Sequence, residues 1–177
     1  MAHIHTQPGQ YDLTVSAYIL TTDPEPSVLL HRHKTLNVYI QPGGHVELDE
    51  NPWQALCREL REETGYGMDQ LTILQPRLRL PKLTGDDLHP QPVCLRSFPF
   101  GTGGTHFHTD LTFAFLTDSD PHHPIDKEES HDFLWLTRSG LLSLPSAQTY
   151  EDVRQVGLYI MDTILTEWAQ VPTCDFR

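Results

Sequence analysis

The amino-acid sequence predicts a sandwich of the α/β or α+β class, in which a β-sheet packs against helices. Segments rich in β-branched and aromatic residues alternate along the chain with segments that carry helix signals. The sequence contains no internal repeat and no low-complexity run. Because 177 residues are enough to bury a substantial core, we expect a single domain over residues 1–177.

The chain begins with three predicted strands. Tyr11–Leu20 and Val28–Arg32 are rich in β-branched and aromatic residues, and the segment between them contains Pro24 and Pro26. These features predict two strands joined by a turn. A shorter strand is predicted at Asn37–Gln41, where a Pro-Gly-Gly sequence ends it.

The clearest helix signal follows these strands. Asn51 is a typical N-cap residue, Pro52 suits the first helical position, and Gln54 stands three residues after the cap. Gly65 is the expected residue just past a helix end. The sequence therefore predicts a helix over Pro52–Thr64.

The rest of the chain adds four predicted strands and one helix. Strands are expected at Leu71–Gln75, Val93–Phe98 and Phe133–Leu136, and an amphipathic helix at Tyr150–Trp168. Thr105–Leu116 alternates between apolar and polar residues, which is typical of a strand. One face of that strand carries His106, His108, Asp110 and Thr112.

The composition excludes several classes of protein. With 24 Asp plus Glu against 12 Lys plus Arg, the net charge is −12, which disfavours long nucleic acid as a ligand. No apolar stretch suits a membrane span, and the first ten residues lack the features of a secretory signal. The three cysteines have no C-x-x-C spacing, which argues against a disulfide framework and a cysteine-ligated zinc. We expect a cytoplasmic protein without a membrane partner.

Three carboxylates gather on one face of the first predicted helix. Glu59, Glu62 and Glu63 fall within about 100° of arc, so their like charges repel one another. Clustered carboxylate oxygens are the ligands that Mg²⁺ or Mn²⁺ selects. From these three residues alone, a solvated acidic face is the more common explanation.

The residues around this helix resemble the box of the Nudix hydrolase family, G-x5-E-x7-R-E-U-x-E-E-x-G-U, where U is a bulky apolar residue. The match is complete, and Tyr66 takes the last apolar place. The matching residues are Gly44, Glu50, Arg58, Glu59, Leu60, Glu62, Glu63, Gly65 and Tyr66.

The resemblance implies an α/β/α sandwich with a mixed sheet between helices. It also implies a hydrolase that uses Mg²⁺ or Mn²⁺ to cleave a nucleoside diphosphate linked to a group X. By this analogy the three helix glutamates and the Gly43 carbonyl hold the metal. The structural residues of the box are Gly44, Glu50, Arg58 and Gly65.

A further glutamate is implied by the same resemblance. The family often carries an acidic residue six positions before a tryptophan in a late strand, and Glu129 stands six before Trp135. Glu129 is therefore the candidate for an additional metal ligand or for the base that activates water. Glu128 is its competitor, and spacing does not show which glutamate takes the proton.

Substrate contacts are expected on two strands. The resemblance places the strand with His106, His108 and Asp110 near the substrate, so contact with base, sugar or phosphate is the first interpretation. A metal site of two histidines and one carboxylate, and a solvated sheet face, are the alternatives. Arg32, in the basic run at residues 31–34, could face the phosphates, or it could end a strand in water.

The substrate class is indicated by a single residue. Pro81 lies fifteen residues after Tyr66, a pattern similar to that of the ADP-ribose pyrophosphatases of the family, which favours ADP-ribose or a nucleotide sugar. The alternatives are a pyrophosphatase for oxidised dNTPs and a non-catalytic nucleotide sensor. The intact box glutamates argue against the sensor. We expect a small nucleotide as partner, and a homodimer stays open.

Overall fold

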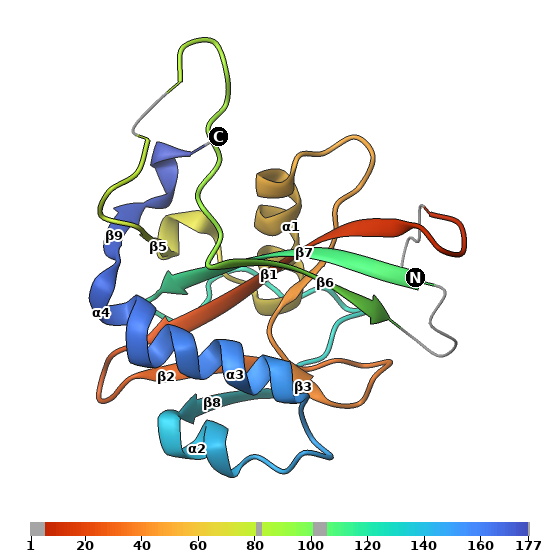
Figure 1. Cartoon of the computed structure of the whole chain (residues 1–177). Helices are drawn as coiled ribbons and strands as arrows, with labels where there is room; N and C mark the ends of the chain where they lie inside the picture. The colour runs from red at the N-terminus through yellow and green to blue at the C-terminus, as the bar shows by residue number, and fades with distance from the viewer. Residues whose placement is uncertain (1–5, 81–82, 101–105, 177) are drawn as a thin grey trace.

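A mixed β-sheet lies between helix α1 on one face and helix α3 on the other (Figure 1). The structure is a computed structural model that describes residues 6–80, 83–100 and 106–176. Pro81, on which the substrate expectation depends, lies outside these residues. The predicted α/β/α arrangement is confirmed.

Nine strands form the sheet within the described residues. Their order is β3-β2-β1-β7-β5-β9, with β4 also paired to β1, β6 to β7 and β8 to β2. The strands are β1 (Tyr11–Thr21), β2 (Ser27–Arg32), β3 (Tyr39–Ile40), β4 (Gly43–His45), β5 (Thr72–Gln75), β6 (Cys94–Phe100), β7 (His106–Leu116), β8 (Phe133–Thr137) and β9 (Ala169–Pro172).

Four α-helices accompany the sheet in the described part of the chain. They are α1 (Pro52–Thr64), α2 (Arg138–Ser143), α3 (Glu151–Tyr159) and α4 (Leu165–Glu167). A π-helical turn at Ile160–Ile164 joins α3 to α4, and short 3₁₀ turns lie at Met68–Gln70 and Thr173–Asp175. None of the described helices combines the length and the apolar character needed to cross a membrane.

The central pair of strands sets the geometry of the sheet. β1 and β7 run parallel over ten residue pairs, from Tyr11 opposite Phe107 to Leu20 opposite Leu116. β2 and β4 are antiparallel to β1, and β6 is antiparallel to β7. Because side chains of paired residues point to the same face, this register decides which distant residues become neighbours.

Each face of the sheet carries its own core. Alternate residues of β1 pack on α1, whose Trp53, Leu56 and Leu60 are buried. The other residues of β1 pack against α3 and the π-helical turn, where Ile160 and Ile164 are fully buried. The alternation of a central strand thus buries apolar side chains on both faces.

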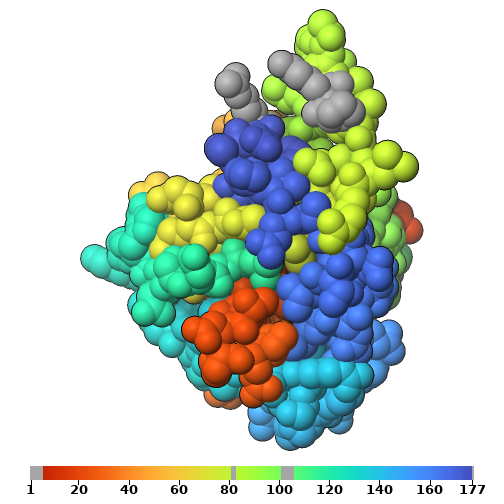
Figure 2. Space-filling model, turned by 90° about the vertical axis from the view of Figure 1, so that its left-hand side faces the viewer, coloured from red at the N-terminus to blue at the C-terminus, as the bar shows by residue number. Residues whose placement is uncertain are grey.

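The outer surface brings together segments that are far apart in the sequence. Figure 2 shows the turn between β1 and β2 (orange) beside the segment that follows β7 (green) and the helices near the C-terminus (blue). The Thr117 amide donates to the Leu20 carbonyl at 2.9 Å, which continues the parallel pairing of β1 with β7.

Two predicted elements differ from the structure. The strand expected at Asn37–Gln41 is only Tyr39–Ile40, because Asn37 adopts a left-handed conformation (φ 58°) and closes a turn on the His33 carbonyl. The expected helix at 150–168 contains the π-helical turn and ends at Glu167. Apolar spacing does not reveal the π-helical turn, since Ile160 and Ile164 are both buried, as they would be in a regular amphipathic helix.

The sequence pattern does not predict three short elements of the structure, β4, α2 and β9. The sequence of β4 is Gly-Gly-His, which is too short to show alternation. α2 has six residues and contains Gly140. β9 follows the last helix directly and exists because β5 offers it an antiparallel partner. Tertiary pairing, rather than local pattern, forms these elements.

Helix α1 depends on a cap that can be tested. The Asn51 side chain accepts a hydrogen bond from the Gln54 amide at 2.9 Å, and the Gln54 side chain accepts one from the Asn51 amide at 2.9 Å. We expect Asn51→Ala to lower the free energy of unfolding by about 1 kcal/mol, because the Gln54 amide loses its side-chain acceptor. Urea denaturation measures the change. Asn51→Asp keeps the acceptor and should stay close to wild type; equal stability of Asn51→Ala and wild type would contradict the prediction.

Candidate active site

The backbone of β4 lies directly against the carboxylates of α1. The Gly43 amide donates to Glu63 Oε2 at 2.8 Å. At Gly44, an added Cβ would lie 2.2 Å from Glu59 Oε1, a distance that no side chain permits. A side chain at Gly44 would displace the Glu59 carboxylate, and a Cβ at Gly43 would lie 2.1 Å from the Val15 carbonyl oxygen. The two glycines therefore allow the close approach that brings Glu59 and Glu63 under the same turn of the chain.

Arg58 connects the acidic groups around this turn. Its NH2 donates to Glu50 Oε1 at 2.6 Å and to the His45 carbonyl at 3.1 Å, and its NH1 donates to Glu59 Oε1 at 2.7 Å. The same NH1 lies 3.3 Å from Glu62 Oε2. The planar guanidinium can bond several acceptors at once, so Arg58 ties the loop of residues 45–50 to the helix.

The pKa values of this group reflect the same contacts. The hydrogen bond to Glu50 raises the pKa of Arg58. Burial acts to raise the pKa of Glu50, but the hydrogen bond from Arg58, the hydrogen bond from the Glu47 amide and the charge of Arg58 together outweigh it, and the net shift is downward. Both groups therefore stay charged at neutral pH, which suits the bracing position of these two residues.

Glu59 is a largely enclosed carboxylate, and Glu63 is a buried one. Their side chains are 13% and 8% exposed. Burial raises the pKa of Glu59, with Arg58 opposing the shift. Burial also raises the pKa of Glu63 well above its usual range, and the charge of Glu59 adds to this, while the Gly43 amide acts in the other direction. Two neighbouring buried carboxylates thus share a site where ionisation is costly without a cation.

Glu62 differs from its two neighbours. Its side chain is 45% exposed, and it borders a groove on the outer side of α1 that is also lined by Arg61, His123 and Asp126. All three helix glutamates remain on adjoining positions of one helical face, as the sequence predicts, but only two of them are enclosed.

Glu129 joins the site from the loop before β8. Its negative charge acts to raise the pKa of both Glu59 and Glu63, so it lies within electrostatic reach of the two buried carboxylates. Lys34 Nζ holds Glu129 Oε1 at 3.1 Å. The side chain of Glu128 is exposed, and its carbonyl accepts a hydrogen bond from Lys34.

His31 lies beside the helix carboxylates, although Arg32 is the candidate residue that the sequence indicates on this strand. It is fully buried, and its Nε2 lies 3.6 Å from Glu63 Oε2. Burial, followed by the charge of His33, lowers the pKa of His31 to about 4. Alternation along β2 shows that residues 29 and 31 share a face, but only the structure shows that Leu29 packs on the α1 side of the sheet.

Arg32 points to the opposite side of β2 from His31. Its Nε donates to Asn37 Oδ1 at 3.0 Å, its NH1 lies 3.5 Å from Asp132 Oδ2, and its guanidinium stands over the Tyr39 ring. The structure therefore brings His31, and not Arg32, against the carboxylates of α1.

The donor set can be compared with the needs of a divalent cation. Apart from the bracing Glu50, the site holds Glu59, Glu62, Glu63 and Glu129, which face the positive charges of Arg58 and Lys34. All of these acidic groups offer oxygen atoms as donors, and Glu59 and Glu63 are enclosed close to each other. Oxygen donors of this kind are those that Mg²⁺ and Mn²⁺ select, so these residues fit such an ion.

The polar residues of β7 divide into two groups. Asp110 is 2% exposed; its Oδ1 accepts hydrogen bonds from the hydroxyls of Thr14 and Ser16, and its Oδ2 accepts one from Thr112, each at 2.8 Å. Arg96 Nε lies 3.7 Å from the same carboxylate. Asp110 is thus enclosed by its own partners, and a solvated face is wrong for this part of the strand.

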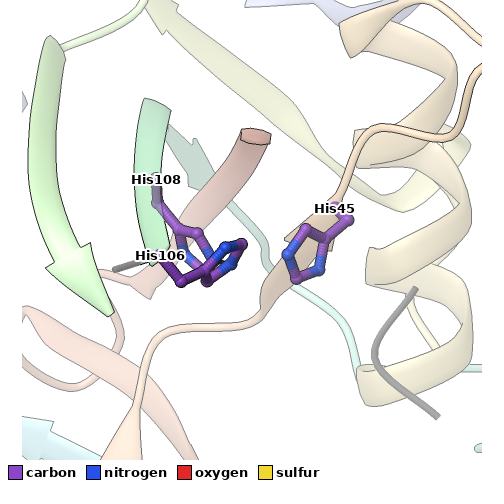
Figure 3. Close-up of side chains that lie close together, drawn as sticks. All are labelled: His45, His106 and His108. Atoms are coloured by element: carbon purple, nitrogen blue, oxygen red, sulfur yellow. Dashed lines mark hydrogen bonds between the residues drawn. The ribbon is translucent and has the colours of Figure 1, made fainter. Parts of the chain in front are cut away.

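His106 and His108 face a different carboxylate. They lie with His45 of β4 in one cluster (Figure 3), and Asp12 Oδ2 is 3.4 Å from His106 Nε2. His108 is buried, and burial together with His45 and His106 lowers its pKa to about 4. The sequence placed these histidines with Asp110, whereas the structure gives them Asp12.

Comparison with known proteins agrees with this geometry. A family model described as the NUDIX domain matches residues 11–155, which covers most of the chain, from β1 to the first half of α3. The chain belongs to the Nudix family. The predicted family membership is therefore confirmed over far more of the chain than the 23 residues from Gly44 to Tyr66 that carry the box.

Relatives of this Nudix chain include proteins of several kinds. It is 40% identical over 63 residues to the m7GpppN-mRNA hydrolase NUDT17 of Xenopus laevis, a match that covers 33% of the chain and 21% of that protein. The match thus spans about a fifth of the length of this relative.

Among solved structures, a NUDIX family hydrolase from Clostridium perfringens has a TM-score of 0.70 and 27% identity, covering 85% of this chain and 96% of the other. The Ap4A hydrolase of C. elegans has a TM-score of 0.58 and 18% identity, with 85% and 96% covered, which shows a shared fold alone.

The bracing position of Arg58 leads to a prediction on stability. Arg58→Lys should lower the free energy of unfolding by about 1–3 kcal/mol, because an ammonium cannot bond Glu50, Glu59 and the His45 carbonyl together. Denaturant unfolding measures the change, and Arg61→Lys, on the exposed side of α1, is the matched control. If both variants unfold at the same denaturant concentration, Arg58 does not brace the site.

Proposed function

We propose that this Nudix chain is a hydrolase that cleaves a phosphoanhydride in a nucleoside diphosphate linked to a group X, with the help of a divalent cation. The observation that carries the proposal is the pair of buried carboxylates, Glu59 and Glu63, enclosed under the turn at Gly43 and Gly44 with raised pKa values. A fold tolerates such a pair where a cation neutralises it.

The metal ligands follow from the same arrangement. Glu59, Glu62, Glu63 and the carbonyl of Gly43 would hold Mg²⁺ or Mn²⁺. Such an ion, when bound, neutralises charge on a diphosphate and lowers the pKa of a water molecule. The chain itself supplies a fixed position for each carboxylate: the Gly43 amide orients Glu63, and Arg58 orients Glu59.

We assign Glu129 as the base that takes the proton from the attacking water. It lies within electrostatic reach of Glu59 and Glu63, is partly enclosed, and is held by Lys34 at 3.1 Å. A carboxylate in this position can accept a proton without belonging to the innermost metal ligands. The exposed side chain of Glu128 has no such surroundings.

In this proposal the substrate belongs to the ADP-ribose or nucleotide-sugar class, because Pro81 lies fifteen residues after Tyr66, the last residue of the box. Oxidised dNTPs are the alternative. Capped RNA enters the comparison because matched relatives from Xenopus laevis and Danio rerio are named m7GpppN-mRNA hydrolases. A phosphate-release screen over ADP-ribose, nucleotide sugars, dinucleoside polyphosphates, oxidised dGTP and capped RNA, with Mg²⁺ or Mn²⁺, separates these classes.

The screen also tests whether the chain is an enzyme at all. Release of a phosphate-containing product from at least one of these compounds, and only in the presence of the cation, is the expected result. Tight nucleotide binding without turnover of any phosphoanhydride would instead indicate a non-catalytic sensor on the same scaffold.

The box glutamates should be essential for turnover. Glu62→Gln and Glu63→Gln each remove one negative charge while keeping the size of the side chain, so the fold should survive and kcat should fall by orders of magnitude. Steady-state kinetics on the best substrate of the screen, with circular dichroism to check folding, measures both effects. If either variant turns over substrate at the wild-type rate, the catalytic assignment of that glutamate is wrong.

The choice between the two loop glutamates has a matched pair of variants. Glu129→Gln should lower kcat by about 10²- to 10⁴-fold, the usual contribution of a positioned base. Glu128→Gln, one residue away and exposed, should leave kcat within a factor of about two of wild type, since its side chain lies outside the site. Equal rates for the two variants would remove Glu129 from the mechanism.

A further inference from the structure

Three histidines form a cluster separate from the carboxylates of α1. Figure 3 shows His106 and His108 on one side and His45 on the other, with their rings turned toward the same space. One ring nitrogen from each can be chosen so that all three lie within 4.8 Å of one another. The Nε2 atoms of His106 and His108 are 3.0 Å apart.

The register of three strands produces this cluster. His45 on β4 is paired with Thr14 on β1, and His108 on β7 is paired with Asp12 on β1. Paired residues, and residues two apart on one strand, share a face of the sheet. Asp12 and the three histidines therefore project from the same face, on strands β4, β1 and β7.

Asp12 provides a second and independent observation. It is 4% exposed, and its Oδ2 accepts no hydrogen bond from any of the described residues. This oxygen lies 3.4 Å from His106 Nε2 and 3.7 Å from His45 Nε2. A buried carboxylate oxygen without a hydrogen bond is costly, and a bound cation would offset that cost.

The spacing suits a tetrahedral ion. With metal-to-nitrogen bonds of about 2.0–2.1 Å, ligand atoms of a tetrahedral zinc site lie about 3.3 Å apart. The Nε2 atoms of His106 and His108 are 3.0 Å apart, and Asp12 Oδ2 lies 3.4 Å from His106 Nε2 and 3.7 Å from His45 Nε2. These separations are close to the tetrahedral value.

Aromatic side chains of β6 enclose the cluster. The Phe100 ring stacks on His108 with centroids 4.4 Å apart, and Phe98 meets the same imidazole edge-on at 5.6 Å. An apolar wall limits water and holds the ring orientation, as in protein metal sites. Asp69, His122 and His123 form another histidine group, but the side chains of Asp69 and His122 are exposed and no comparable wall is described there.

We propose that His45, His106, His108 and Asp12 bind a divalent transition-metal ion of the Zn²⁺ class. Three imidazoles and one carboxylate complete a four-coordinate shell, which is typical of a structural site. Nitrogen ligands favour Zn²⁺ over Mg²⁺, so this ion is distinct in kind from the one proposed for the carboxylates of α1.

The proposed ion site lies next to the turn at Gly43 and Gly44. The carbonyl of His45 accepts a hydrogen bond from Arg58, and the preceding residues Gly43 and Gly44 contact Glu63 and Glu59. An ion that joins β4 to β1 and β7 would therefore hold the turn that encloses the catalytic carboxylates. The role is a positioning one.

Cobalt provides a direct test, because tetrahedral Co²⁺ absorbs visible light and Zn²⁺ displaces it. The full chain, in a large excess of Mg²⁺, should bind one Co²⁺ with a tetrahedral spectrum. His106→Gln and His108→Gln should each weaken the binding more than roughly 100-fold, beyond the loss expected for a residue outside the ligand shell. If either variant fails to fold in circular dichroism, Asp12→Asn takes its place and should weaken binding at least roughly 10-fold.

Two controls separate this site from the others. His122→Gln, in the exposed histidine group, and Glu63→Gln, in the proposed catalytic site, should both keep the cobalt spectrum and the wild-type affinity. The proposal is overturned if wild-type chain binds no Co²⁺ under these conditions, or if the folded histidine variants bind it as wild type does. A raised KM in His108→Gln with unchanged cobalt affinity would also overturn it, in favour of substrate contact.

Discussion

The contact between the Gly43–Gly44 backbone and the carboxylates of α1 is the constraint on which the rest of the structure depends. A side chain at Gly44 would displace the Glu59 carboxylate, and one at Gly43 would collide with the backbone of β1, so the two glycines let the strand lie against these carboxylates. Once they do, Glu59 and Glu63 are enclosed and their pKa values rise through burial. The same close approach therefore creates the concentration of negative charge on which the proposed cation site rests.

Arg58 limits the cost of that arrangement without removing it. Its guanidinium neutralises part of the charge on Glu50, Glu59 and Glu62, and it anchors the loop through the His45 carbonyl. Glu63 accepts a hydrogen bond from the Gly43 amide and lies beside the imidazole of His31, while the charges of Glu59 and Glu129 act on it. The chain braces its site with one arginine, and the charge that remains on Glu59 and Glu63 is what the proposed cation would neutralise.

The parallel pairing of β1 with β7 organises the other half of the molecule. Its register sets Thr14 beside Asp110 and Asp12 beside His108, so one strand supplies partners to two different polar groups. Asp110 becomes a satisfied buried carboxylate, while Asp12 keeps an oxygen free of hydrogen bonds from the described residues and faces imidazoles. Two acidic residues on neighbouring strands thus acquire opposite characters from their neighbours alone.

The sequence by itself determined helix α1 and the box, because a capping residue, an apolar stripe and a carboxylate face all depend on neighbours within a few positions. Most strands followed for the same reason. Only the tertiary structure decided that His31 rather than Arg32 faces Glu63, and that His106 and His108 meet His45 and Asp12 rather than Asp110. These contacts join residues more than thirty positions apart, and strand order and register, which no local pattern encodes, set them.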